Sequence, residues 1–333
     1  MPDVLVTRRM VDAAMSALDG LGEVLGEVLG EVEVYEGPPT AMPRPDLLRR
    51  ASGVSGLVTV LTERVDAELL DAAGPGLRIV ANHAVGVDNI DIPECTRRGV
   101  LVTNTPDVLT EATADLAWAL ILACVRRVAE GDRFLRARTP WIWDPRMMLG
   151  QDLHGRVLGI VGCGRIGQAT ARRALGFGMR VVYHNSRPLP EEIAAPLGAR
   201  HVGFDELLAS SDVVSVHCPL TPDTRHLFGA SAFRKMKASA VLVNTARGPV
   251  VDEAALAVAL REGEIFGAGL DVFEREPEVT AELLDLDSVT IVPHLGSATV
   301  GTREAMGLRA VQNLAAGLAG GRPRDLLNPD VLG

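Results

Sequence analysis

Short runs of β-branched and other apolar residues alternate with helical stretches along most of the chain, in two successive series. Such alternation is typical of parallel strands joined by crossover helices. The first series has runs at 4–7, 32–35, 56–61, 77–82 and 100–104, and the second at 157–162, 180–184, 213–217, 240–244, 268–273 and 289–293. We therefore expect two doubly wound parallel sheets, one in each of two domains, with a cleft between the domains.

The length of the chain and its longer helical stretches fit this division. A chain of 333 residues suits two domains better than one core. Helical stretches are expected at about 108–131, between the two series, and at about 300–320, after the second. The apolar run LAWALILACV at 116–125 is too short to cross a bilayer, so it is interpreted as a buried helix.

Composition and charge exclude several classes of partner. Hydrophobic residues make up 47% of the chain and charged residues 23%, as in soluble globular proteins. The net charge of −10 opposes binding to nucleic acid and to anionic membranes. The cysteines are far apart and form no C-x-x-C pair, so we expect neither a metal site nor disulfides. The start MPDVLVTRR lacks a signal-peptide apolar region, which predicts a cytoplasmic protein.

One glycine motif indicates a dinucleotide site. Gly162, Gly164 and Gly167 have the spacing G-x-G-x-x-G between an apolar run and an alanine-rich helical stretch. In that context the first glycine permits a tight turn, the second lets the pyrophosphate approach, and the third allows close helix–strand packing. The N–H groups at the start of the helix then bind the phosphates. The second series is therefore expected to form a Rossmann-like domain.

The turn after the run at 180–184 bears on the choice of cofactor. An NAD site usually has Asp or Glu near this point, where it accepts a hydrogen bond from the ribose 2′-hydroxyl. Here the residues are Asn185, Ser186 and Arg187. No carboxylate would repel a 2′-phosphate, and an arginine is available to pair with one. We predict a preference for NADPH, with NADH as the alternative; an arginine that only faces solvent is the competing interpretation.

Four polar side chains follow strands of the second series, at the edge where ligands bind in open parallel sheets. They are His217, Arg247, Glu276 and His294. A guanidinium can hold a substrate carboxylate, and a histidine can protonate a carbonyl oxygen. A carboxylate beside that histidine would orient it and keep it charged. The set predicts hydride chemistry on a 2-keto acid.

Other charged and polar residues are less informative. Asp271 falls within the apolar run 268–273, where an unpaired charge is costly, so it needs a partner in the protein or in the nicotinamide carboxamide. The remaining histidines are interpreted as surface or turn residues: His83, His154, His184, His201 and His226. Beside His83, Gly86 and its neighbours are expected to offer backbone N–H groups to a carboxylate.

Several stretches together resemble the D-2-hydroxyacid dehydrogenase family, most closely its glyoxylate/hydroxypyruvate reductase branch. They are ANHAVGVDNID at 81–91, GIVGCGRIG at 159–167, VNTARGPVVDE at 243–253, GLDVFEREP at 269–277 and PHLGSAT at 293–299. The stretches follow the order and spacing of the family over most of the chain.

The resemblance assigns roles residue by residue. Arg247 is similar to the substrate-binding arginine, His294 to the acid/base and Glu276 to its carboxylate partner. Val85 and Gly86 resemble the backbone segment that binds the substrate carboxylate, and Ser297 lies beside the histidine near the substrate. Further cofactor contacts are implied for Thr113, Arg165, Ile166, His217, Pro219, Thr224, Thr245, Asp271 and Gly296.

The resemblance also implies a domain order and an assembly. The substrate domain would be discontinuous, 1–103 plus 295–333, with the dinucleotide domain 104–294 inserted. The family is usually dimeric, and in the glyoxylate/hydroxypyruvate branch a tryptophan reaches the active site of the partner subunit. Trp143 resembles that residue by spacing, with Trp141 as the other candidate.

The expected function is the NADPH-dependent reduction of glyoxylate and hydroxypyruvate to D-2-hydroxy acids. Alternatives are a reductase of bulkier substrates such as phenylpyruvates or 2-ketogluconate, and an NADH-linked phosphoglycerate dehydrogenase. The Asn at 185 and the end of the chain at 333 disfavour the latter. A non-enzymatic alternative is a dinucleotide-sensing protein like the corepressors that share this fold.

Overall fold

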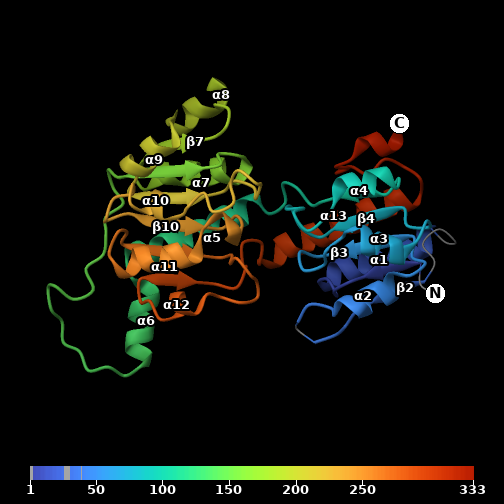
Figure 1. The fold of residues 1–333 in the computed structure, drawn as a ribbon, viewed down its shortest axis with the longest axis horizontal. Helices are drawn as coiled ribbons and strands as arrows, with labels where there is room; N and C mark the ends of the chain where they lie inside the picture. Colours follow the sequence, from blue (N-terminus) through green and yellow to red (C-terminus); the bar gives the residue numbers. More distant parts are fainter. Residues whose placement is uncertain (1–2, 26–30, 39) are drawn as a thin grey trace. The chain divides into compact units, whose positions relative to one another are not determined.

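The computed structural model describes residues 3–25, 31–38 and 40–333, with only the backbone described at 21–25. The chain divides into two compact units: unit 1 comprises Met1–Leu109 and Thr299–Gly333, and unit 2 comprises Thr110–Ala298. Each unit has its own parallel sheet with helices packed on it (Figure 1). The expected class of two parallel-sheet α/β domains is confirmed.

Unit 1 has, within the described residues, a five-stranded parallel sheet in the order β2-β1-β3-β4-β5. Its strands are β1 (Val4–Val6), β2 (Val32–Val34), β3 (Gly56–Thr59), β4 (Ile79–Asn82) and β5 (Leu101–Thr103). Its helices are α1 (Asp12–Leu25), α2 (Arg44–Ala51), α3 (Ala67–Ala73), α4 (Ile92–Arg97) and α13 (Val300–Leu318). Leu57 and Val80 pack with α2, α3 and α4, whereas Val58 and Ile79 pack with α1 and α13. Alternate strand residues therefore serve two cores, one on each face.

Unit 2 has a seven-stranded parallel sheet in the order β12-β11-β10-β9-β6-β7-β8, counted over the same described residues. Its strands are β6 (Val157–Val161), β7 (Arg180–His184), β8 (Ala199–His201), β9 (Val213–Val216), β10 (Val241–Asn244), β11 (Gly267–Leu270) and β12 (Val289–Ile291). Its helices are α5 (Thr110–Val125), α6 (Val128–Arg136), α7 (Arg165–Gly176), α8 (Glu191–Ala194), α9 (Phe204–Ser210), α10 (Ala230–Phe233), α11 (Glu253–Arg261) and α12 (Ala281–Leu284).

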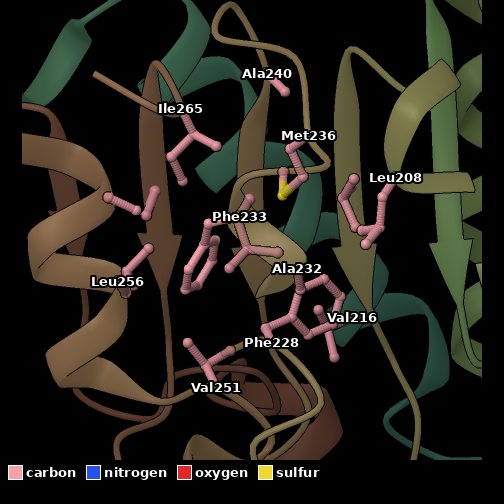
Figure 2. Close-up of a cluster of buried hydrophobic side chains, with 14 of the residues drawn as sticks. Leu208, Val216, Phe228, Ala232, Phe233, Met236, Ala240, Val251, Leu256 and Ile265 are labelled. Atoms are coloured by element: carbon pink, nitrogen blue, oxygen red, sulfur yellow. The ribbon is translucent and has the colours of Figure 1, made fainter. Parts of the chain in front are cut away.

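Two hydrophobic cores cover the faces of the unit 2 sheet. On one face Phe228 and Phe233 are fully buried and, with Leu256 of α11, form the cluster drawn in Figure 2. On the other face Leu158 and Ile160 pack against α5 and α7. The two layers fix the strands, and with them the loops that leave the carboxyl ends of the strands.

The helical stretch predicted at 108–131 is two helices. Arg127 has a left-handed backbone conformation with φ of 54°, so α5 ends before it and α6 begins after it. Strand β8 was not predicted, because its three residues are polar or partly exposed and form no apolar run. Among the described residues, no helix is long and apolar enough to cross a membrane.

The boundaries between the two units lie after Leu109 and after Ala298. Both are a few residues later than the predicted boundaries after 103 and after 294. The first difference has a clear cause in unit 1. The amide of Thr105 donates to the Ala84 carbonyl at 2.9 Å, and the side chain of Asn104 donates to the Val85 carbonyl at 2.8 Å. These bonds keep the chain in unit 1 beyond the end of β5.

Candidate active site

The candidate site in unit 2 lies at the carboxyl edge of its sheet. Strands β6 and β9 are neighbours in the sheet, although β7 and β8 lie between them in the sequence. The strand order therefore reverses direction between β6 and β9. Ligands of open parallel sheets bind at such a switch point, beyond the carboxyl ends of the strands. The loops after β6, β9, β10, β11 and β12 all leave this edge, because every strand pair in the sheet is parallel.

His294 and Glu276 form a hydrogen-bonded pair at this edge. Nδ1 of His294 lies 2.8 Å from Oε2 of Glu276. A carboxylate can only accept, so Nδ1 carries the hydrogen and Nε2 is left to act on a substrate. The backbone of His294 has φ of 51°, and its amide donates to the carbonyl of Asp271 at 2.9 Å. The loop after β12 therefore has an uncommon backbone conformation at His294, which is held by its contact with the residue that follows β11.

Glu276 is held by its own loop. The amide of Phe273 donates to Oε1 of Glu276 at 3.1 Å, while the other oxygen faces His294. Partial burial acts to raise the pKa of the Glu276 carboxyl, yet the hydrogen bond and charge of His294, helped by Arg247, outweigh it, so this pKa lies below its usual value. The carboxylate therefore stays ionised and remains a hydrogen-bond acceptor for Nδ1 of His294.

Arg247 follows β10 and is positioned by Asn244, the last residue of that strand. The Asn244 side chain donates to the Arg247 carbonyl at 2.9 Å and accepts from the Ala246 amide at 3.0 Å. The next residue, Gly248, packs against the loop after β11: a Cβ there would lie 1.9 Å from the carbonyl carbon of Phe273. Only glycine allows this approach, which brings the loop of Arg247 against the loop of Glu276.

Asp271 lies directly after β11 rather than within a strand, which corrects its predicted placement. Its buried carboxylate accepts from the amides of Leu295 at 2.5 Å and Gly296 at 2.9 Å, so its partner is the turn that follows His294. Burial raises the pKa of Asp271 to about 6 despite these bonds. The carbonyl of Gly296 accepts from Oγ1 of Thr113 at 3.0 Å, which ties the same turn to α5.

The glycine motif has the geometry expected for a dinucleotide loop. Gly162 has φ of 90°, and a Cβ at Gly167 would lie 2.5 Å from the carbonyl oxygen of Gly162, so both positions need glycine. A Cβ at Gly164 would meet nothing within 4 Å, which leaves space for a ligand to approach the backbone. Gly164 caps α7, whose second and third residues are the half-buried Ile166 and the buried Gly167. Their first-turn N–H groups are available to an anion.

Two buried polar atoms at the same edge suit a polar ligand. Oγ1 of Thr245 and Nδ1 of His217 have no hydrogen-bond partner among the residues that the structure describes. Nε2 of His217 is paired with Oγ of Ser215 at 2.8 Å, and burial lowers the pKa of His217 to about 4. Buried polar atoms are normally satisfied, so these two indicate where a bound molecule completes the hydrogen bonding.

The turn after β7 presents its arginine to solvent. Oδ1 of Asn185 accepts from the amide of Cys163 at 2.6 Å and so braces the glycine loop, whereas Ser186 and Arg187 are exposed. No group of three or more His, Cys, Asp or Glu side chains suited to a metal occurs in the described part of the chain.

Other predicted residues are more dispersed. Exposed Pro219 accepts from Oγ1 of Thr224 at 2.7 Å in the loop after β9, and Ser297 is half-buried beside Gly296. Arg165 is exposed at the start of α7. Val85 and Gly86 belong to unit 1, and each is half-buried.

The interpretation of His83 as a surface or turn residue is wrong. His83 is buried, and burial together with the charge of Arg303 lowers its pKa to about 4. It directly follows the buried strand β4, and the apolar run before it was the signal for burial. Of the other histidines in that group, His154, His201 and His226 are exposed and His184 is half-buried.

Glu253 is a supporting residue that sequence reasoning missed. Its buried carboxylate accepts from the amide of Glu274 at 2.6 Å and also pairs with the hydroxyl of Thr280. It thereby holds both ends of the loop that contains Glu276. The signal was an acidic residue at the first helical position after Asp252, whose side chain caps α11.

Comparison with known proteins places the chain in a family. Residues 118–296 match the model of the D-isomer specific 2-hydroxyacid dehydrogenase NAD binding domain. A glyoxylate reductase from Thermococcus onnurineus is 51% identical over 335 residues, covering 99% of this chain and 97% of that protein. A crystal structure from Thermus thermophilus has a TM-score of 0.88 at 47% identity, covering 97% of this chain and 99% of that one.

A further structure carries ligands. The NADPH-dependent glyoxylate/hydroxypyruvate reductase of Sinorhizobium meliloti, in complex with NADP and malonate, has a TM-score of 0.81 at 35% identity and covers 98% of this chain and 96% of that one. From the domain match and the near full-length identity, the chain belongs to the D-isomer specific 2-hydroxyacid dehydrogenase family.

Proposed function

We propose that this protein is an NADPH-dependent reductase of glyoxylate and hydroxypyruvate that forms the D-2-hydroxy acid. The observation that carries the proposal is the His294–Glu276 pair, joined at 2.8 Å, with the charge of Arg247 acting on the same carboxylate. The relatives named glyoxylate reductase support the substrate class. The four cysteines are free and buried, which suits a reducing compartment, and we place the enzyme in the cytoplasm.

The chain's own residues account for binding and proton transfer. In unit 2, Arg247 would bind the substrate carboxylate with two parallel hydrogen bonds. In unit 1, the backbone amides of Val85 and Gly86 are proposed as carboxylate-binding groups. Nε2 of His294 donates its proton to the carbonyl oxygen, while Glu276 accepts from Nδ1 and holds the ring in one tautomer. When bound, reduced NADPH supplies the hydride that completes the alcohol.

The cofactor would be held by residues of α5 and of the loops at the carboxyl edge of the unit 2 sheet. The glycine loop and the first turn of α7 would hold the pyrophosphate, through Gly162, Gly164, Arg165, Ile166 and Gly167. Oγ1 of Thr245 and Nδ1 of His217, which have no partner among the described residues, would complete their hydrogen bonding with the cofactor. Thr113, Pro219, Thr224, Asp271 and Gly296 would shape the nicotinamide end.

Arg187→Ala tests the cofactor preference. We expect kcat/KM for NADPH to fall at least tenfold, about 1.4 kcal/mol, because an exposed guanidinium no longer pairs with the 2′-phosphate. The value for NADH should not change. The control is Arg180→Ala, which removes an exposed arginine at the opposite end of β7. Equal effects on NADPH and NADH, or none, would mean that Arg187 faces only solvent.

We also propose a homodimer formed through α6 and the segment after it. In Figure 1 this part extends away from the rest of unit 2, and none of the residues in α6 is buried. Ile142 is 81% exposed and Trp143 is 79% exposed. Apolar side chains exposed in one segment are typical of an interface with a second copy.

Trp143→Ala tests the role of this segment at the substrate site. We expect KM for hydroxypyruvate to rise roughly tenfold, the equivalent of about 1.4 kcal/mol of lost apolar contact. Trp141→Ala removes the same side chain two positions earlier and tests the other candidate. We expect its KM to be unchanged, and a rise in this variant alone would assign the role to Trp141. Steady-state rates with sedimentation of both variants provide the measurement. Unchanged kinetics in Trp143→Ala would remove the residue from the substrate site.

A substrate panel tests the proposed function against its alternatives. Initial rates with glyoxylate, hydroxypyruvate, phenylpyruvate, 2-ketogluconate and phosphohydroxypyruvate rank the substrate classes. The proposal expects the first two to have the highest kcat/KM. A preference for any of the other three would replace the substrate, and tight dinucleotide binding without turnover would indicate a sensor protein instead.

A further inference from the structure

The segment that carries Val85 and Gly86 has its carbonyls tied to unit 1 and its amides free. The carbonyls of Ala84, Val85 and Gly86 accept from Thr105 N at 2.9 Å, Asn104 Nδ2 at 2.8 Å and Asn82 Nδ2 at 3.0 Å, respectively. The amides of Val85 and Gly86 find no acceptor in the part of the chain that the structure describes. Each residue is half-buried, so its amide is within reach of a small ligand.

Peptide geometry links these two facts. In a trans peptide the carbonyl of one residue and the N–H of the next point in opposite directions. With the Ala84 carbonyl bound on the side of unit 1, the Val85 N–H must point the other way. In the same way, the bond from Asn104 to the Val85 carbonyl makes the Gly86 N–H point away from Asn104. Asn104 therefore sets the direction of one of the two amides that would bind a carboxylate.

Both asparagines are themselves fixed. Asn104 is 9% exposed, and its carbonyl accepts from Nδ2 of Asn313 in α13 at 3.2 Å. Asn82 is fully buried at the end of β4, and its Oδ1 accepts from the hydroxyl of Thr59 at 3.0 Å in the paired strand. Buried amides that are held by hydrogen bonds form rigid supports. The orientation of the backbone at 84–86 is therefore set through contacts with the sheet and α13.

We infer that Asn104, assisted by Asn82, is a positioning residue for substrate carboxylate binding, which it promotes by holding the Val85–Gly86 peptide with its N–H outward. The inference rests on the proposed function and adds to it a residue that does not touch the substrate. Without the Asn104 donor, this peptide is free to rotate, and a carbonyl oxygen would then face the carboxylate and repel it. Carboxylate binding weakens, whereas the dinucleotide loop in unit 2 is unaffected.

The test compares Asn104→Ala and the isosteric Asn104→Asp, which cannot donate when ionised, with Asn328→Ala. Asn328 is the matched control: it is 4% exposed in unit 1. Its side chain bonds the backbone of Val100 and Val102, and Val102 pairs with Val80 rather than with the 84–87 segment. Oxalate titrated into the NADPH-loaded protein measures carboxylate binding without turnover. Thermal unfolding reports whether each variant folds, and NADPH fluorescence reports cofactor binding.

We expect both Asn104 variants to bind oxalate at least tenfold more weakly and to raise KM for glyoxylate by a similar factor, with kcat changed less and NADPH affinity unchanged. Asn328→Ala should keep the wild-type oxalate affinity even where it lowers the unfolding temperature. Wild-type affinity in the Asn104 variants, an equal loss in the Asn328 control, or no oxalate binding by the wild type would overturn the inference. A wild type that binds oxalate but does not reduce glyoxylate would instead reject the proposed function alone.

Discussion

Replacing His294 by asparagine is expected to lower kcat for glyoxylate by about 10²–10⁴-fold, the usual contribution of a positioned general acid. The amide of asparagine is polar and of similar size, so it can occupy the position of the imidazole ring beside Glu276. It cannot donate a proton to the carbonyl oxygen. NADPH affinity should stay within about twofold of the wild type, because no predicted phosphate or ribose contact is removed. Stopped-flow rates and fluorescence titration measure the two quantities.

The chain offers a matched control for this variant. His226 is also paired with a carboxylate in unit 2, with Nε2 lying 3.1 Å from Oε2 of Glu274, but it is exposed in the loop before α10. His226→Asn should keep near-wild-type kcat. A near-normal kcat in His294→Asn would remove His294 as the proton donor, and an equal loss in both variants would point to a structural effect.

Replacing Arg247 by alanine is expected to lower kcat/KM for glyoxylate by at least about 10²-fold, mainly through KM. Two hydrogen bonds to a charged group contribute about 1.5–3 kcal/mol each, and both would be lost. The change also removes a positive charge that helps to lower the pKa of Glu276, so a smaller fall in kcat should accompany it.

Arg247→Lys and Arg261→Ala separate the parts of that effect. Lysine keeps the charge but loses the paired donors, so its kcat/KM should lie between alanine and the wild type. Arg261 is exposed at the end of α11 and its removal should leave the kinetics unchanged. An unchanged KM in Arg247→Ala would show that the substrate carboxylate is held elsewhere.

Much of the fold was predictable from the sequence because both sheets are parallel and buried on two faces. Strands such as β6 and β10 are nearly continuous apolar runs for that reason, and such runs are easily recognised. The edge strand β8 is short and exposed, so it leaves no such run. The break between α5 and α6 depends on the backbone of Arg127, which no side-chain pattern reports.

The placement of a side chain at the carboxyl edge of the sheet was predictable where the residue closely follows a strand. His294 and Glu276 come from different loops, and the rule that parallel strands end at one edge was enough to expect them together. The contacts of Asn104 and Glu253 were not predictable, since these depend on which backbone groups each side chain reaches across the fold. The partner of Asp271 shows the same limit: it is the backbone of the turn after His294.

Initial rates with glyoxylate and with hydroxypyruvate, each measured with NADPH and with NADH, test the proposed activity most directly. We expect turnover of both keto acids, with kcat/KM at least tenfold higher for NADPH than for NADH. A kcat/KM at least tenfold higher with NADH than with NADPH would contradict the proposed role of Arg187, while leaving the proposed chemistry of the site intact. No turnover with either cofactor would contradict the proposed reductase activity itself.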